Sequence, residues 1–96
     1  QPLKNITHLY LGTKIGNKGL EYIKVLPNLT ELGLEWTKVN DDGIVHLAAM
    51  KNLKNFSIRC THISDVGIEK LKKCFPDCLI YHSDLEEAKH HEFLFN

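Results

Sequence analysis

The chain has 96 residues, enough for one domain with one core, and its 12 basic side chains balance 12 acidic ones to a formal net charge of zero. This balance excludes the long-range attraction to nucleic acid or anionic lipid that a basic excess supplies. No apolar run approaches the roughly 18 residues of a spanning helix, and no basic-then-apolar leader is visible, so we expect a soluble domain without membrane insertion.

The stretch GTKIGNKGLEYI, from Gly12 to Ile23, carries three glycines and two lysines and raises the question of a phosphate-binding loop. Its glycine spacing, G-x-x-x-G-x-x-G, fits neither the Walker loop nor the dinucleotide fingerprint. The stretch also recurs twice at intervals of 24 residues, so we interpret it as one copy of a repeat. The threonines that open the three copies are Thr13, Thr37 and Thr61.

A short strand is predicted before each of these threonines. Leu32 and Leu34 alternate with polar residues in the second copy, and Phe56 and Ile58 do the same in the third. Such alternation is typical of a strand with one buried face. The first copy, which starts at Ile6, is one residue shorter than the others.

A helix is predicted after each turn. Asn40 and Ser64 are capping-type residues, and the apolar residues behind them recur at helical spacing. The glycine that all copies share is expected to let the first helical turn approach its strand closely; it is Gly19, Gly43 and Gly67. Six apolar residues in equivalent columns are predicted to be buried: Leu32, Leu34, Leu47, Phe56, Ile58 and Leu71.

The period and the L-x-x-L-x-L opening of each unit, as in Leu29 to Leu34, resemble the leucine-rich repeat family over about residues 3 to 85. The resemblance implies an α/β fold, a short solenoid with parallel strands on its concave side and helices on its convex side. The form T-x-V/I-x-D-x-G-I/L is similar to short bacterial arrays of the planctomycete-like type and, less closely, to mitochondrial proteins of the coupling factor B type. We expect a single domain, 1–96, with units at about 3–28, 29–52 and 53–77 and a capping unit at 78–96.

The two ends of such a stack need covering, because a terminal unit otherwise leaves its apolar flank in water. Leu3, Ile6 and Leu9 begin the first strand with no visible cap, so we expect upstream repeats or another subunit at this edge. At the other end Ser83 and Glu86 form a capping box, which predicts a helix over the last repeat. A frayed tail is the alternative.

The three cysteines are interpreted as thiols rather than as a disulfide framework. Cys74 falls in the column of Met50, and Cys78 in that of Leu53, so both are expected to be buried in place of apolar residues. Cys60 follows the third strand and is expected to be the more accessible thiol. An odd count of thiols favours a reducing compartment, foremost the cytoplasm.

Histidine offers no metal or catalytic pattern in this sequence. Two i, i+4 pairs near the C-terminus, Glu86 with His90 and Glu87 with His91, lack a third ligand, and the His and Cys spacings of zinc sites are absent. No nucleophile and base can be paired either. We therefore expect no cofactor, no metal and no enzymatic activity.

Residues between the buried strand positions point away from the core and form the candidate binding surface. In the last unit Ile80 and His82 are expected to point outward. The candidate partner-binding residues are His8, Tyr10, Glu31, Glu35, Trp36, Asn55, Arg59 and His82. They mix aromatic, acidic and basic types, and Trp, Tyr and Arg are enriched at interface hot spots. The alternative for Trp36 is that its ring folds down onto Cys60 or the neighbouring turn.

Two functions remain open from the sequence. The first is a non-catalytic interaction module that binds a protein or peptide on its concave strand face. The second is a structural subunit, or a C-terminal segment of a larger repeat protein or assembly, that docks through its N-terminal edge. Fold alone does not choose between them.

Overall fold

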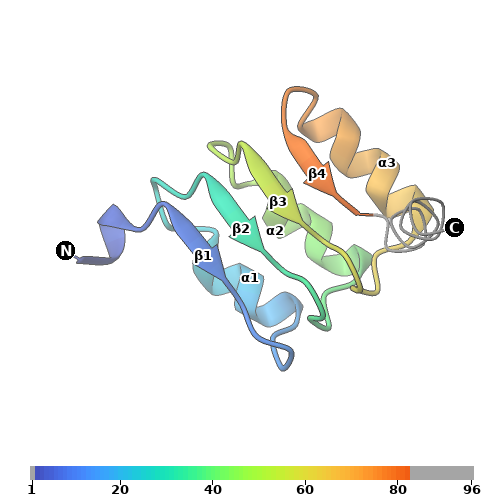
Figure 1. The fold of residues 1–96 in the computed structure, drawn as a ribbon, viewed down its shortest axis with the longest axis horizontal. Helices are drawn as coiled ribbons and strands as arrows, with labels where there is room; N and C mark the ends of the chain where they lie inside the picture. Colours follow the sequence, from blue (N-terminus) through green and yellow to red (C-terminus); the bar gives the residue numbers. More distant parts are fainter. Residues whose placement is uncertain (1, 83–96) are drawn as a thin grey trace, which may run out of the picture.

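Strands and helices alternate along the chain in the order that the repeat predicts (Figure 1). The computed structural model describes residues 2–82. Its elements in chain order are η1 (Pro2–Asn5), β1 (His8–Tyr10), α1 (Asn17–Ile23), β2 (Glu31–Gly33), η2 (Asp41–Gly43), α2 (Ile44–Ala48), β3 (Asn55–Ser57), α3 (Asp65–Cys74) and β4 (Leu79–Tyr81), where η denotes a 3₁₀ helix. The capping helix that the sequence predicts from Ser83 lies outside the described residues. None of the helices within residues 2–82 is long and apolar enough to cross a membrane.

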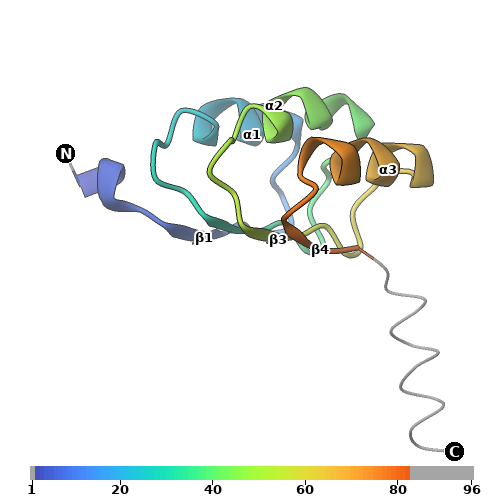
Figure 2. The same cartoon turned by 90° about the horizontal axis from the view of Figure 1, so that it is seen from above.

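The four strands form one parallel sheet in the order β1-β2-β3-β4. The helices α1, α2 and α3 form a second layer over one face of this sheet, as Figure 2 shows. Each strand is connected to the next through its helix, so the molecule is a short α/β solenoid of stacked units. This architecture confirms the predicted fold class.

The register confirms that the first unit is shorter and shows where the residue is missing. His8 lies opposite Glu31, 23 positions later, whereas Glu31 lies opposite Asn55, 24 positions later. After the turn the spacing is 24 residues again. The Lys38 N–H donates to the Ile15 carbonyl, and the residues 24 positions later make the same bond, from the His62 N–H to the Val39 carbonyl. The first unit is therefore shortened in the turn that follows β1.

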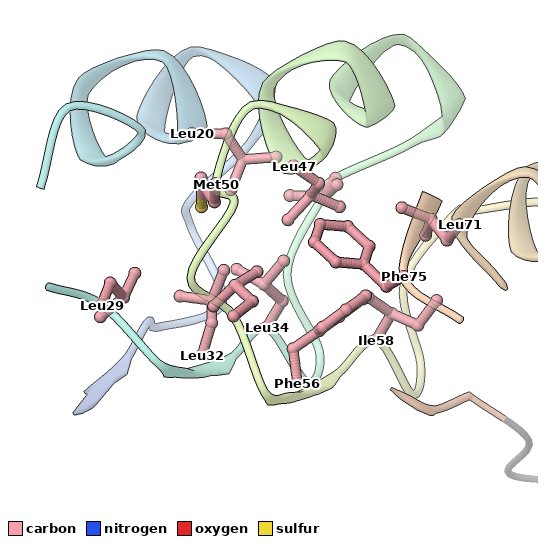
Figure 3. Packing of buried hydrophobic residues seen from close by; sticks show 12 residues of the cluster. Leu20, Leu29, Leu32, Leu34, Leu47, Met50, Phe56, Ile58, Leu71 and Phe75 are labelled. Atoms are coloured by element: carbon pink, nitrogen blue, oxygen red, sulfur yellow. The ribbon is translucent and has the colours of Figure 1, made fainter. Parts of the chain in front are cut away.

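Side chains from the strand layer and the helix layer meet in one core (Figure 3). All six residues of the predicted columns are buried, each with at most 2% of its surface exposed. Phe75 closes the core beyond α3, and its ring contacts the ring of Phe56 edge to face, with centroids 5.3 Å apart. The burial pattern thus confirms the inward positions that the alternation predicts.

In the second and third units the shared glycine allows close stacking on the preceding unit. A Cβ atom on Gly67 would lie 2.6 Å from Oδ1 of Asp41 and 2.9 Å from Cδ1 of Ile44, both in the preceding unit. One on Gly43 would likewise meet Asn17 and Leu20 of the first unit. At Gly43 and Gly67 the crowded neighbour is therefore the start of the preceding helix and not the strand, whereas a Cβ atom on Gly19 would meet Ile15 of its own unit.

Polar side chains join the helix starts of neighbouring units. Asn40 caps η2 by accepting a hydrogen bond from the Asp42 N–H at 3.0 Å, and Ser64 caps α3 by accepting from the Gly67 N–H at 3.1 Å, which confirms both predicted caps. The Asn40 N–H donates to Asn17 Oδ1 at 3.1 Å, and the Ser64 N–H donates to Asp41 Oδ1 at 2.7 Å. Each cap therefore also receives support from the unit before it.

The N-terminal segment differs from the expectation. Leu3 lies in the 3₁₀ helix Pro2–Asn5 and not in the first strand, which begins at His8. The Asn28 side-chain amide donates to the Lys4 carbonyl, and the equivalent Asn52 amide donates to the Pro27 carbonyl at 2.7 Å. The segment before β1 is thus fastened to the next unit by the same type of bond that joins later units.

Truncating the core should unfold the stack. We expect Phe56→Ala or Leu34→Ala to lower the free energy of unfolding by about 2 to 5 kcal/mol, because each removes a fully buried apolar side chain and leaves a cavity. Glu69→Ala on the exposed side of α3 is the control and should change it by less than about 0.5 kcal/mol. Urea titration of the three variants measures the difference; equal midpoints would contradict the core assignment.

Acid should weaken the contact between the second and third units. Hydrogen bonds from the Ser64 hydroxyl and backbone N–H hold the pKa of Asp41 below its ordinary value of 3.8. A lowered folded-state pKa stabilises the fold above the unfolded-state value, and this contribution is lost as the pH falls through the folded-state pKa. We therefore expect the melting temperature of wild type to exceed that of Asp41→Asn near neutral pH and the gap to shrink below about pH 4. A gap that stays constant on acidification would exclude this role for Asp41.

Candidate binding surface on the strand face

The strand face is the side of the sheet that α1 to α3 leave open, and its side chains follow from strand alternation. In each strand the middle residue points to the core and the outer two point away from it. We define the strand face by the outward residues His8, Tyr10, Glu31, Gly33, Asn55, Ser57, Leu79 and Tyr81, together with Glu35 and Arg59 from the turns that follow.

A shallow depression of about 330 Å³ lies in the middle of this face. Five of the eight predicted binding residues line it: Tyr10, Glu31, Glu35, Asn55 and Arg59. The other lining residues are Leu32, Gly33, Ser57 and Tyr81. The tertiary structure thus brings residues from all four units together in one place.

Tyr10 forms one wall of the depression. Its ring contacts Gly33 of the next strand so closely that any Cβ atom at that position would overlap the ring. Gly33 is consequently buried, whereas Tyr10 remains 66% exposed. Glycine in β2 therefore allows an aromatic ring to lie across the sheet while most of its surface still faces the solvent.

Arg59 lies in the depression and contacts Tyr81, which forms the wall opposite Tyr10. Its guanidinium lies 5.2 Å from the centroid of the Tyr81 ring, a cation–π distance, and its Nη1 lies 3.6 Å from Oε2 of Glu35. The Arg59 side chain is 28% exposed, so it is partly withdrawn from solvent. One cation is thus held between a carboxylate and an aromatic ring.

His8 and Glu31 face each other beside the first wall. Nε2 of His8 lies 3.6 Å from Oε1 of Glu31, and this pair is an ion pair only when the imidazole is protonated. The hydroxyl of Ser57, in the floor of the depression, is buried with no hydrogen-bond partner among the described residues. The floor therefore contains one polar group whose hydrogen-bonding capacity is unused among these residues.

Trp36 stands at the rim, in a turn with an unusual backbone. The hydroxyl of Thr37 donates to the Leu34 carbonyl at 2.7 Å, and Thr61 makes the equivalent bond to Ile58 at 2.6 Å. The residues before these threonines, Trp36 and Cys60, take positive φ angles of 65° and 59°. Trp36 is 67% exposed, so its ring does not fold down onto the molecule as the alternative proposed.

The outward residues of the last strand were predicted wrongly. Ile80 lies opposite Phe56 and packs on the core, and Leu79 and Tyr81 point outward. The prediction counted from Cys78 as the equivalent of Leu53, which shifts β4 by one residue. Counting 24 residues from Asn55 and Ser57 would have found Leu79 and Tyr81, and Tyr81 is the residue of the depression that the sequence analysis missed. His82 follows β4 and does not line the depression.

The reading of the cysteines also needs correction, because the core position that corresponds to Met50 lies 25 residues later, at Phe75, and not at Cys74. Cys74 ends α3 and is exposed, because the buried place beyond the helix belongs to Phe75. Cys78 is half-buried against the core, and this burial raises the pKa of its thiol. Cys60 is intermediate in exposure. Cys74 and Cys78 are free thiols; both were expected to be buried, but Cys74 is exposed and is therefore more accessible than Cys60, contrary to the prediction.

Within the described part of the chain, no three side chains of His, Cys, Asp or Glu gather as a metal site requires. The pairs formed by Glu86, His90, Glu87 and His91 lie outside it. The lining of the depression contains aromatic rings, charged groups and hydrogen-bonding groups.

Thiol labelling should separate the three cysteines. We expect a maleimide reagent to modify Cys74 first in the native protein, since it is exposed, and Cys78 last, since burial disfavours its reactive thiolate. Mass spectrometry after timed quenching gives the order, and Cys74→Ser should remove the fast phase. Fast labelling of Cys78 would contradict the structure.

The repeat was compared with known proteins. A family model described as "Leucine Rich repeat" matches residues 25–48 and 49–72, which together make up half of the chain. Neither the search of curated proteins nor the search of solved structures gave a match. The two matched segments, the 24-residue spacing and the stacked strand–helix units agree, and the chain belongs to the leucine-rich repeat family.

Proposed function

We propose that this protein is a non-catalytic interaction module that binds a protein or peptide segment on its strand face. Leucine-rich repeats generally mediate protein–protein interaction and are typically not catalytic. The fold by itself names no partner and no face. The choice of face rests on the composition and shape of the surface.

The observation that carries the proposal is the depression with Tyr10 and Tyr81 as its walls and Arg59 between them. Tyr and Arg are residue types that dominate interface hot spots, because they combine a large contact area with directed polar groups. Adjacent strands lie about 4.8 Å apart, so an extended segment that crosses them meets a new side chain at each strand. A volume of about 330 Å³ suits a few side chains of such a segment.

The exposed side chain of Trp36 adds further support. Left-handed backbone costs a residue with a Cβ atom roughly 1 to 2 kcal/mol, and the exposed ring recovers little of this cost by packing. Cys60 has the same backbone conformation in the equivalent turn, so the turn imposes this strain and the support for binding comes from the exposed ring of Trp36. An exposed tryptophan beside the depression extends the proposed contact surface to the rim.

A display library of random peptides, selected against the whole chain, tests the proposed face. We expect the selected peptides to lose at least about 2 kcal/mol of binding free energy on Arg59→Ala or Tyr10→Ala, as hot-spot truncations do. Glu69→Ala and Lys72→Ala, on the exposed side of α3, are the matched controls and should bind as wild type. Melting curves for all four variants separate lost contacts from lost folding. If the α3 variants lose binding and the strand-face variants keep it, the partner contacts the helices and the proposal fails.

Trp36 offers a sharper test, because one substitution should raise stability and lower affinity together. Trp36→Gly relieves the left-handed strain and should stabilise the fold by up to about 1 kcal/mol, while it removes the aromatic contact. Trp36→Ala is the matched control, since it removes the same ring and keeps a Cβ atom in the strained turn. Urea titration and affinity for a selected peptide are measured on both. Equal stability of the two variants would refute the strain, and wild-type affinity in both would exclude Trp36 from the interface.

A second candidate function is docking through the free edge of β1. Leu9 of β1 is only half-buried, whereas the equivalent Leu32 of β2 is 1% exposed, because no strand among residues 2–82 covers that side. A partner strand at this edge would slow the hydrogen exchange of the β1 amides, and Arg59→Ala would leave its affinity unchanged. Unchanged exchange in a complex of measurable affinity would exclude edge docking.

A further inference from the structure

The depression on the strand face already contains one cation, the guanidinium group of Arg59. Arg59 of the chain itself lies between the carboxylate of Glu35 and the ring of Tyr81, at 3.6 Å and 5.2 Å. The planar guanidinium suits this position, because it pairs with a carboxylate at its edge and stacks on an aromatic ring with its face. This arrangement occupies the side of the depression nearer to β4, with its carboxylate from the turn after β2, its guanidinium from the turn after β3 and its ring from β4.

The other half repeats the same pair of residue types. Tyr10 and Glu31 supply an aromatic ring and a carboxylate from β1 and β2, and both line the same depression. Gly33 supports one side of the Tyr10 ring, and the ring remains 66% exposed. The described neighbour of the Glu31 carboxylate is His8, which carries a positive charge only when protonated.

The charges of the lining favour a cation as well. Glu31 and Glu35 bring two carboxylates to the depression, against the single guanidinium of Arg59. An acidic segment would have to compete with Glu35 for Arg59 and would meet Glu31 beside it. A basic side chain would instead balance the charge of the lining.

We propose that the Tyr10 and Glu31 half of the depression binds an arginine side chain of the partner segment, in the way that Arg59 is bound in the other half. This inference rests on the proposed function and names the chemistry of the partner. Lysine fits more weakly, because its ammonium group pairs with the carboxylate but lacks the planar face that stacks on the ring. The partner is thus a protein or peptide segment with an exposed arginine.

The probe is a blocked heptapeptide of glycine and serine with one central arginine, titrated into the isotope-labelled protein at low salt. The titration is run at pH 8, where histidine is mostly neutral. We expect saturable amide shifts at Tyr10, Glu31 and Gly33 with millimolar affinity. The same peptide with central glutamine should bind about threefold to tenfold more weakly, since it lacks the charge for the carboxylate and the ring.

Three variants test the residues involved. Glu31→Gln and Tyr10→Leu should each reduce the affinity for the arginine peptide by about threefold or more. Leucine at position 10 still covers Gly33, so this variant separates the loss of the ring from a loss of folding. Glu69→Gln on α3 is the matched control for charge and should bind as wild type. Equal affinity for the arginine and glutamine peptides, or shifts centred on the helices, would overturn the inference.

The library selection separates this inference from the function on which it rests. Selected peptides that need Tyr10 and Arg59 but contain no basic residue, and that bind Glu31→Gln as well as wild type, would overturn the arginine subsite and leave the strand-face proposal standing. Selected peptides that are indifferent to both Tyr10 and Arg59 would overturn both. Peptides enriched in arginine whose affinity falls on Glu31→Gln would support both.

Discussion

The structure depends on stacking, because no single unit can bury its own apolar surface. Leu34 and Leu47 of the second unit are fully buried only because a unit lies on each side of them. Close stacking in turn requires a residue without a side chain at Gly43 and Gly67, where any Cβ atom would collide with the preceding helix start. The caps around Asn40 and Ser64 then satisfy the polar groups of that crowded region across the unit boundary.

The same stack creates the surface that we propose to be functional. A parallel sheet with helices on one side presents every second strand residue to the other side, in register across all four strands. Residues far apart in sequence, such as Tyr10 and Tyr81, thereby line one depression with Arg59 between them. These outward positions are not needed to close the core, so their side chains are free to determine what binds.

In the turns after β2 and β3, one residue stabilises the turn and the residue before it is exposed or partly exposed. Thr37 and Thr61 each fix a tight turn with a hydroxyl bond to the carbonyl three residues earlier. The geometry of that turn requires a positive φ at the preceding residue, which glycine would adopt with least strain. The chain has Trp36 and Cys60 at these positions instead of glycine. Trp36 also carries a large and mostly exposed ring beside the strand face.

The sequence by itself determined the fold class, the period, the six buried columns and the two helix caps, because each of these is a local pattern that repeats at a fixed spacing. It also named five of the residues that line the depression, since alternation tells which side chains leave the core. Only the tertiary structure decided the frame of the last unit, where the core position after α3 falls to Phe75, 25 residues after Met50, and β4 returns to the 24-residue spacing, which places Tyr81 and not His82 in the depression. It also decided that Tyr10 lies over Gly33 and that Arg59 lies between Glu35 and Tyr81. Such contacts arise between units, and a repeat pattern specifies the position of each residue within its unit but not the neighbour that it meets in the next.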